Sequence, residues 1–344
     1  MGDTVKNEID IVILWVDGND VVWQKEKEKY QQMDGQDARN NRYRDWGTLQ
    51  FLFRGIEKFA PWVNKIHLVT CGQVPKWLNL DNPKIHLVTH KEFISQEFLP
   101  TFSSRAIDLN LHKIPGLAEK FIYFNDDMFI LKPLSESMFF RNNLPCDIFS
   151  ERAICCSGNG ETVIAHTFVN NMEMMARHFK RRDVMKKNWR KILNIRYGKT
   201  FFYNLLTYLL PYKNLYGLYM HHLPMGYLKH NFEEIWAMEE KALTKTVSHK
   251  FRNINDVNQF IFRFWPLLKG EFYPYNMDKL GKSYGIYSNR DQINAIIENQ
   301  SKHLICLNDD CNDEHYLLLK DSLINSFKRI FPEKSAYELY DEYK

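Results

Sequence analysis

Four short apolar segments in the first 150 residues constrain the fold more than any other feature of this sequence. Residues 9–16 and 121–124 are nearly continuous apolar runs, and the hexapeptide Lys-Ile-His-Leu-Val-Thr occurs at both 65–70 and 84–89. Apolar segments of this length are typical of buried strands. Stretches with helical spacing separate several of them, and strands that alternate with helices indicate a parallel sheet covered on both faces. We therefore predict an α/β fold in which the two hexapeptides are neighbouring strands.

The rest of the chain divides by composition into two further parts. Lysine and arginine crowd residues 177–199, where Asp183 is the only acid, and an aromatic, leucine-rich stretch follows. We interpret residues 151–220 as a helical insertion between an α/β core, residues 1–150, and a C-terminal part, residues 221–344. The pattern of the C-terminal part is mixed but mostly helical, and we expect it to complete the active site.

Composition and charge exclude several classes of protein. A formal net charge of +4 over 344 residues is too small to indicate nucleic-acid binding. The longest apolar-rich run, residues 201–212, is well short of the ~20 residues that a membrane span needs, and the N-terminus lacks the features of a secretory signal. The six cysteines form no C-x-x-C pair, so we expect free thiols in a reducing cytosol. We predict a cytoplasmic protein, soluble or peripherally bound to the inner face of the plasma membrane.

Acidic turns follow two of the predicted strands, at the edge of the sheet where ligands bind in folds of this class. Asp17 and Gly18 follow the first strand, and Asn125, Asp126 and Asp127 follow the fourth. Carboxylates that converge at a strand end are suitable ligands for a hard cation, Mg²⁺ or Mn²⁺. Gly18 lets the backbone approach a ligand closely. Ordinary turns are the alternative for both segments.

Several arginines are candidates for binding an anion, although each is also consistent with a solvated surface. Arg42 and Arg44 precede a predicted helix and could hold a phosphate with two hydrogen bonds each. Arg105 lies on the polar face of a helix predicted over residues 103–117. Arg252 precedes a helical pattern, and we expect it to form an anion site together with the N-terminus of that helix.

Histidines supply the candidates for proton transfer. His222, in the segment His221-His222-Leu223-Pro224, is the preferred candidate for a general base or a nucleophile, because histidine titrates near neutral pH. His112 shares the polar face of the predicted helix with Arg105. A buried or surface histidine without a chemical role is the alternative for any single one of them.

In their order along the chain, these motifs resemble four conserved regions of the Stealth family. The first spans residues 9–23 (IDIVILWVDGNDVVW). The second spans 42–130 and includes RYRDWGTLQFLFRGIEKFAPW and FIYFNDDMFI. The third spans 221–270, with HHLP and HKFRNIND, and the fourth spans 305–338, with CLNDD and FPEKSAYE. The family comprises sugar-1-phosphate transferases, among them bacterial capsule enzymes and the N-acetylglucosamine-1-phosphotransferase of lysosomal targeting. The resemblance covers over half of the chain and leaves 151–220 outside.

The resemblance implies a glycosyltransferase-A-like, Rossmann-type core and a specific reaction. A hexose-1-phosphate, expected to be an N-acetylhexosamine-1-phosphate, would pass from a UDP-sugar to a hydroxyl of a saccharide or capsule polymer, and UMP would leave. Asp126 and Asp127 would bind Mg²⁺ or Mn²⁺, and His222, Asp127 and Arg252 would be catalytic. The residues expected to bind the nucleotide-sugar are Asp17, Gly18, Arg42, Arg44, Arg105 and His112.

Two other functions stay open at this point. A metal-dependent glycosyltransferase would use the same donor but release UDP, and a polysaccharide- or membrane-binding protein would have no catalytic site. The basic and aromatic insertion is consistent with contact to an anionic membrane or a phosphate-bearing polymer, and equally with a solvated helix. We expect no nucleic-acid partner.

Overall fold

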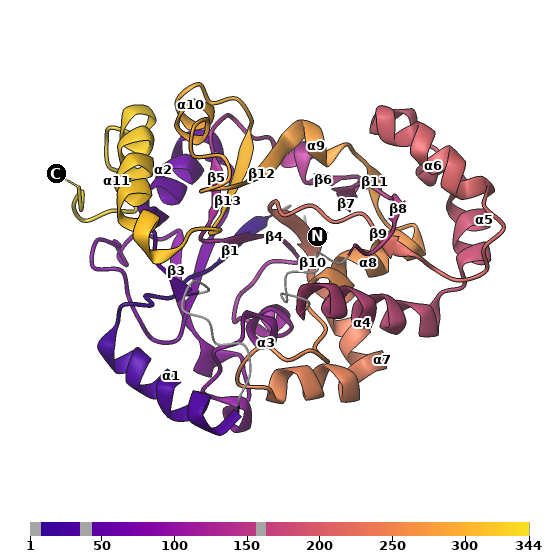
Figure 1. The fold of residues 1–344 in the computed structure, drawn as a ribbon, viewed down its shortest axis with the longest axis horizontal. Helices are drawn as coiled ribbons and strands as arrows, with labels where there is room; N and C mark the ends of the chain where they lie inside the picture. The colour runs from indigo at the N-terminus through magenta and orange to yellow at the C-terminus, as the bar shows by residue number, and fades with distance from the viewer. Residues whose placement is uncertain (1–7, 35–42, 156–162, 344) are drawn as a thin grey trace, which may run out of the picture.

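A five-stranded sheet forms the centre of the molecule, and helices surround it (Figure 1). The computed structural model describes residues 8–34, 43–155 and 163–343. Across the sheet the strands are β10 (Met225–Leu228), β4 (Lys120–Asn125), β1 (Ile9–Leu14), β2 (Ile66–Thr70) and β3 (Ile85–Thr89). β4, β1, β2 and β3 are parallel, and β10 adds an antiparallel edge. The predicted α/β fold with a parallel sheet is confirmed.

The two copies of the hexapeptide are adjacent strands, as predicted. β2 and β3 pair in register, so that each residue lies opposite its counterpart, for example His67 opposite His86. Two nitrogens of these rings, one from each histidine, are 2.9 Å apart, and Nε2 of His67 is 3.0 Å from a carboxylate oxygen of Asp10 on β1. Polar groups buried in a sheet need such partners. This lateral chain of side chains therefore favours one alignment of β1, β2 and β3.

Several helices pack into the hydrophobic core through apolar faces. Nearly all of α2 (Leu49–Phe59) is buried, and its Phe51 stacks on Phe327 of α11 (Asp313–Ile330) with ring centres 5.2 Å apart. The helices are α1 (Val21–Asp34), α2 (Leu49–Phe59), α3 (Ser104–Asp108), α4 (Val163–His178), α5 (Arg181–Ile192), α6 (Lys199–Leu209), α7 (Lys229–Ser248), α8 (Phe260–Lys269), α9 (Met277–Leu280), α10 (Ile293–Glu298) and α11 (Asp313–Ile330). Within the described ranges, none of them is long and apolar enough to cross a membrane.

A small sheet brings the C-terminal part of the chain beside the turn that follows β4. Its order is β12 (Gly281–Gly285), β13 (Leu304–Asn308) and β5 (Met128–Ile130), with β13 antiparallel to β5. The N–H of Leu307 donates to the carbonyl oxygen of Asp127 over 2.8 Å. Because β5 begins directly after Asp127, this pairing places Asn308 next to the acidic turn.

The segment predicted as an insertion begins and ends in two short strands that pair with each other. β8 (Glu151–Arg152) is antiparallel to β9 (Gly217–Leu218). Between them, the described residues form α4, α5 and α6, and Figure 1 shows α5 and α6 at the outer edge of the molecule. The remaining strands are β6 (Phe140–Arg141), β7 (Leu144–Asp147) and β11 (Tyr273–Pro274).

Two helical predictions were wrong in their bounds. The helix expected over residues 103–117 ends at Asp108, and a single 3₁₀ turn follows at Leu111–Lys113. The side chain of Asn110 donates to the carbonyl of Ala106 over 2.9 Å, a local bond that competes with regular helix. The helix expected after Arg252 begins only at Phe260, so Arg252 does not lie at its N-terminus.

Candidate active site

A cavity of about 590 Å³ lies beyond the carboxyl ends of β1, β2 and β4. Val16 and Cys71 line it from the ends of β1 and β2, and the acidic turn after β4 forms its floor. Residues of α3 and α4, the segment 220–222 and Arg252 form the other walls. Ligand sites of α/β sheets occupy this position, and the volume is within the range of small-molecule pockets.

Asp126 and Asp127 line both this cavity and a smaller one of about 110 Å³ beside it. Burial and the charge of Asp127 raise the pKa of Asp126 well above its usual range, and Asp45 adds to this effect. Burial also raises the pKa of Asp127, although His222 opposes the shift. Among the described residues, Oδ1 of Asp127 has no hydrogen-bond partner although the atom is buried. Crowded carboxylates with an unpaired buried oxygen fit a divalent cation with oxygen ligands.

His222 lies between two asparagines that fix which of its nitrogens carries the proton. Its Nδ1 is 2.7 Å from Oδ1 of Asn308, and its Nε2 is 3.3 Å from Nδ2 of Asn125. An amide oxygen only accepts and an amide nitrogen only donates. Both contacts therefore require a proton on Nδ1 and a lone pair on Nε2. Since His222 also lines the cavity, this imidazole can accept a proton or attack through Nε2.

A buried chain of hydrogen bonds orients Asn125. The hydroxyl of Tyr123 lies 2.6 Å from Oδ1 of Asn125 and 2.8 Å from a carboxylate oxygen of Asp108. One hydroxyl hydrogen cannot serve both acceptors. Burial raises the pKa of Asp108 to about 7, against the weaker effects of Tyr123 and of two arginines. Near neutral pH, protonated Asp108 can donate to Tyr123, and Tyr123 can then donate to Asn125.

His221 has a different environment from His222. Its Nε2 is 3.6 Å from Oδ1 of Asp147, and Asp147 forms an ion pair with Arg263 over 2.7 Å. Burial and the charge of Arg263 lower the pKa of His221. His221 is therefore a neutral buried histidine beside an ion pair, whereas both ring nitrogens of His222 have a hydrogen-bond partner.

Cys306 is the third group close to His222 and Asp127. Its Sγ is 3.5 Å from Nδ1 of His222, and potential ligand atoms of the three residues lie within 4.8 Å of one another. A soft metal at this position would need a thiolate. Burial and the negative charge of Asp127 raise the pKa of the Cys306 thiol well above its usual range. Without a bound metal the neutral thiol is thus the stable form, so a soft metal at this position would have to displace its proton.

Two of the predicted arginines, Arg105 and Arg252, line the cavity. Nη1 of Arg105 donates to the carbonyl oxygen of Asn253 over 2.9 Å and to the carboxylate of Asp256 over 3.2 Å. Nη2 of Arg252 donates to Oγ of Ser104 over 2.9 Å. The two guanidinium groups therefore place positive charge in the lining of the cavity, and the buried carboxylate of Asp256 offsets part of the charge of Arg105.

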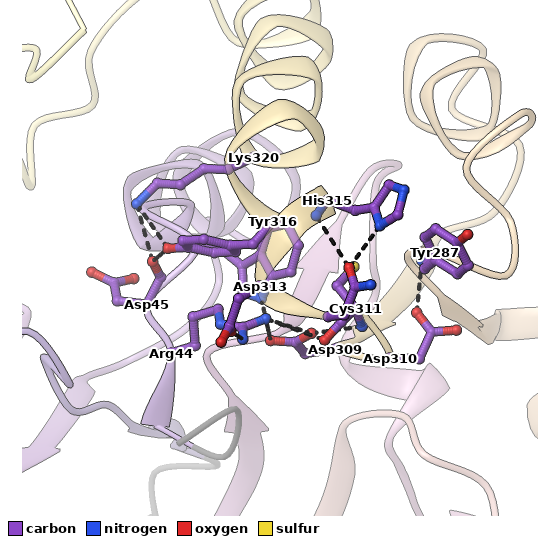
Figure 2. A network of polar contacts seen from close by, with 12 residues as sticks. Arg44, Asp45, Tyr287, Asp309, Asp310, Cys311, Asp313, His315, Tyr316 and Lys320 are labelled. Carbon is purple, nitrogen blue, oxygen red and sulfur yellow. Dashed lines mark hydrogen bonds and ion pairs between the residues drawn. The ribbon is translucent and has the colours of Figure 1, made fainter. Parts of the chain in front are cut away.

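Arg44 lines the smaller cavity, to which Asp126 and Asp127 also belong, and takes part in a polar network with the C-terminal part of the chain (Figure 2). It donates to Asp309 over 3.2 Å, pairs with Asp313, and lies over the ring of Tyr316 at 4.6 Å. Lys320 of α11 donates to the carbonyl oxygen of Asp45 over 3.0 Å in the same network. These contacts join the segment before α2 to α11. Because Arg44 pairs with the carboxylates of Asp309 and Asp313, it holds the C-terminal part of the chain against the segment before α2.

Three of the other residues predicted to bind the nucleotide-sugar are His112, Asp17 and Arg42. His112 is buried against the rings of Phe232 and Trp236, at 5.7 and 6.0 Å, and is not among the residues that line the cavity. Burial lowers its pKa to about 3, so it is neutral. Oδ1 of Asp17 accepts from the N–H of Asn19 over 2.9 Å within the turn after β1. Arg42 lies outside the described residues.

Gly18 is required by the close approach of the backbone to Tyr43. A Cβ atom at this position would lie 1.8 Å from the carbonyl oxygen of Tyr43, so no other residue fits without a shift of the chain. The ring of Tyr43 lines the cavity, and its hydroxyl donates to the carbonyl oxygen of Phe102 over 2.9 Å. Gly18 thus shapes the site through Tyr43.

Sequence reasoning missed the groups that orient His222. Asn308, Cys306 and Tyr123 received no role, and Asn125 was noted only as part of the acidic turn. One signal was available, because Asn-Asp-Asp occurs both at 125–127 and at 308–310. In the structure the two asparagines that begin these turns contact the same imidazole from opposite sides.

Models of two conserved regions of one protein family match this chain. Stealth protein conserved region 1 matches residues 7–34, and Stealth protein conserved region 2 matches residues 42–147. The second match contains the acidic turn, Arg44 and Arg105, and the first contains Asp17 and Gly18.

Several bacterial phosphotransferases are similar to this chain over nearly its whole length. The capsular polysaccharide phosphotransferase WcwK of Streptococcus pneumoniae is 39% identical over 334 residues, which cover 96% of this chain and 98% of that protein. The receptor polysaccharide phosphotransferase WefC of Streptococcus oralis is 34% identical, with coverage of 97% and 100%. The exopolysaccharide phosphotransferase cps2G of Lactiplantibacillus plantarum is 34% identical, with coverage of 96% for both chains. Mouse xyloside xylosyltransferase 1 is a weak structural match, with a TM-score of 0.35, 9% identity and coverage of 89% and 98%.

Proposed function

This chain belongs to the Stealth family of polysaccharide phosphotransferases, and we propose that it transfers a hexose-1-phosphate from a UDP-sugar to a hydroxyl of a saccharide or capsule polymer. The observation that supports this most is the position of His222. Its unprotonated Nε2 borders a cavity that also contains two adjacent carboxylates and two arginines. A base, a cation site and anion ligands in one cavity are the groups that phosphoryl transfer requires.

In the proposed reaction, the oxygen of the acceptor hydroxyl forms a bond to the β-phosphorus of the donor. The bond between this phosphorus and the oxygen that bridges to the α-phosphate breaks, and UMP leaves with that oxygen. The hydroxyl proton passes to Nε2 of His222. The product is a phosphodiester between the donor sugar and the acceptor, so atoms and charge balance without a further reactant.

The residues of the cavity have separate roles in this proposal. His222 accepts the proton, and Asn308 stabilises the resulting imidazolium through Nδ1–H. Arg252 and Arg105 contribute positive charge to the wall that would face the phosphates. A divalent cation, Mg²⁺ or Mn²⁺, held by Asp126 and Asp127 would supply positive charge against the diphosphate.

Aromatic side chains of the cavity support a nucleotide-sugar as the donor. Trp15, Trp23, Tyr43 and Phe102 all line it, and flat rings of this kind stack on bases and on the apolar faces of sugars. The volume of about 590 Å³ is large enough for a compound of this size. We propose an N-acetylhexosamine donor, a capsule or exopolysaccharide acceptor, and a cytoplasmic site of action.

The nucleotide that is released tests the proposal against its main alternative. Purified protein incubated with UDP-N-acetylglucosamine, Mg²⁺ and capsule fragments should release UMP, and EDTA should stop this release. UDP release would indicate a glycosyltransferase and would refute phosphosugar transfer. A panel of other UDP-sugars extends the test if neither nucleotide forms, and absence of UMP with all of them would also refute the proposal.

A variant of His222 tests its role separately. His222→Ala should lower the rate of UMP release by at least about 100-fold, the lower range of general-base catalysis, while the protein still binds the UDP-sugar. The matched control is His303→Ala, because this histidine contacts the carbonyl oxygen of Pro133 and does not line the cavity; it should leave the rate nearly unchanged. A loss of less than about tenfold for His222→Ala would show that another group takes the proton.

A further inference from the structure

Helix α6 presents an apolar face to solvent. Phe202, Leu206 and Leu209 are 68%, 67% and 70% exposed, and Leu205 on the same face is also exposed. These positions are spaced three and four residues apart, so they form one stripe along the helix. Asn204 faces inward, where its side chain donates to the carbonyl oxygens of Phe149 and Ile192. A surface helix usually buries its apolar face, whereas α6 is held with that face outward.

The segment that contains this apolar face is rich in exposed basic side chains. Between residues 180 and 213 the sequence contains a single acid, Asp183. Ile195, in the turn between α5 and α6, is 83% exposed. The exposed basic residues of this segment are Lys180, Arg182, Lys186, Lys187, Arg190, Arg196, Lys199 and Lys213.

Contacts with the protein fix this segment in place. Arg181 is buried and pairs with Glu151 of β8 over 2.8 Å, and it also donates to carbonyl oxygens at the end of α6. Lys191 donates to the carbonyl oxygens of Gly270 and Phe272 over 2.6 and 2.8 Å. These bonds attach α5 and α6 to the rest of the protein. The apolar side chains of α6 are therefore held at the surface by a fixed segment.

We propose that α5, α6 and the turn between them form a docking surface for the headgroup region of an anionic lipid bilayer. An exposed apolar stripe beside many lysines and arginines matches such a surface, where acyl chains take up the apolar side chains and lipid phosphates attract the basic ones. A soluble acidic polymer would use the basic residues but would leave Phe202, Leu206 and Leu209 in water. A second copy of this chain would bring two strongly basic surfaces together.

The position of the surface is compatible with an active enzyme on a membrane. Among the described residues, neither α5 nor α6 lines the large cavity, which α4 reaches through Ile164 and Phe168. Figure 1 shows α5 and α6 at the outer edge of the molecule. Docking would therefore leave the cavity accessible to a soluble donor. The inference does not depend on the proposed reaction.

Vesicle flotation with the purified full-length chain tests this docking surface. The protein should float with vesicles of phosphatidylcholine and phosphatidylglycerol and should not float with phosphatidylcholine alone. Phe202→Ser/Leu206→Ser/Leu209→Ser and, separately, Lys186→Glu/Lys187→Glu should each lower the partition coefficient at least about tenfold. All substituted side chains are exposed, so circular dichroism and melting should be unchanged.

Matched variants on other surfaces distinguish binding through this docking surface from non-specific binding to vesicles. Leu317 and Leu318 of α11 are 68% and 73% exposed, and Leu317→Ser/Leu318→Ser should leave flotation unchanged, as should Lys241→Glu/Lys245→Glu on α7. Absence of flotation, or equal flotation of the patch variants, would overturn the proposal. A dimer in light scattering that the serine variant dissociates would also overturn it, because the surface would then be a self-association interface. Binding to a phosphate-bearing polysaccharide without binding to vesicles would have the same consequence.

Discussion

Removal of the amide of Asn308 should slow catalysis without weakening donor binding. In the resting state, Oδ1 of Asn308 accepts a hydrogen bond from neutral Nδ1–H of His222 over 2.7 Å. When Nε2 accepts the proton, the same bond becomes charge-assisted. A neutral bond contributes about 0.5–1.5 kcal/mol and one to a charged group about 1.5–3 kcal/mol. The difference, about 1–2 kcal/mol, applies only to the protonated state that forms during reaction.

Asn308→Ala should therefore lower kcat by about 5- to 30-fold, since each 1.36 kcal/mol corresponds to a factor of ten, and KM for the UDP-sugar should change by less than about threefold. Asn308→Asp keeps an acceptor for Nδ1–H and should retain most of the activity. The assay is steady-state UMP release, together with ¹⁵N NMR of labelled histidine, in which Asn308→Ala should lower the population of the Nδ1–H tautomer of His222.

Asn312 provides a matched control for Asn308. It caps α11 by accepting from the N–H of His315 over 3.1 Å, so Asn312→Ala disturbs the same region without touching His222. This variant should keep kcat within about twofold. If Asn308→Ala behaves like Asn312→Ala, or if it raises KM while kcat is unchanged, Asn308 does not act through the imidazole and the reasoning is wrong.

Three further predictions concern stability and metal binding. The pKa of Asp108 is about 7 in the folded protein against an ordinary value of 3.8, so folding stability should fall as pH rises from about 4 to about 7. Asp108→Asn should remove up to about 4 kcal/mol of this pH-dependent loss in the free energy of unfolding, measured by urea unfolding at several pH values. If the free energy of unfolding changes with pH equally in both proteins, this prediction is wrong. Glu338→Ala should lower the free energy of unfolding by about 3 kcal/mol, because Glu338 pairs with buried Arg54 over 2.7 Å; a loss below about 1 kcal/mol would argue against this. Mg²⁺ at ten times its Kd should raise Tm by about 2 °C, EDTA should reverse the shift and Asp127→Asn should abolish it, whereas an unchanged shift in this variant would exclude Asp127 as a ligand.

The fold was predictable where local sequence patterns coincide with the final structure. The identical hexapeptides at 65–70 and 84–89 became the adjacent parallel strands β2 and β3. The antiparallel edge strand β10 was not predicted, because Met225–Leu228 is short and its pairing with β4 depends on tertiary contacts. The helix over 103–117 was overestimated because Ile107, Leu111, Ile114 and Leu117 follow one another at helical spacing. Leu111, Ile114 and Leu117 are buried although the helix ends at Asp108.

The candidate site was predictable to the extent that its residues follow strands or form short motifs. Asp126, Asp127, His222, Arg105 and Arg252 were all singled out from the sequence, and all of them line the same cavity. Their chemical roles stay predictions. The contacts of Arg44 with the start of α11 could not be predicted, because the arginine and its partners are more than 260 residues apart in the sequence.

The position of His222 depends on strand pairing between distant parts of the chain. Asn125 comes from the end of β4, and Asn308 comes from the end of β13, which reaches the site only by pairing with β5. The contacts of Arg44 and Arg54 hold the C-terminal part on the core. Since loop closure over such separations is costly, β13 needs these contacts to stay in place. Loss of the C-terminal contacts would therefore release Asn308 from His222, and only the longer contact with Asn125 would then favour a proton on Nδ1.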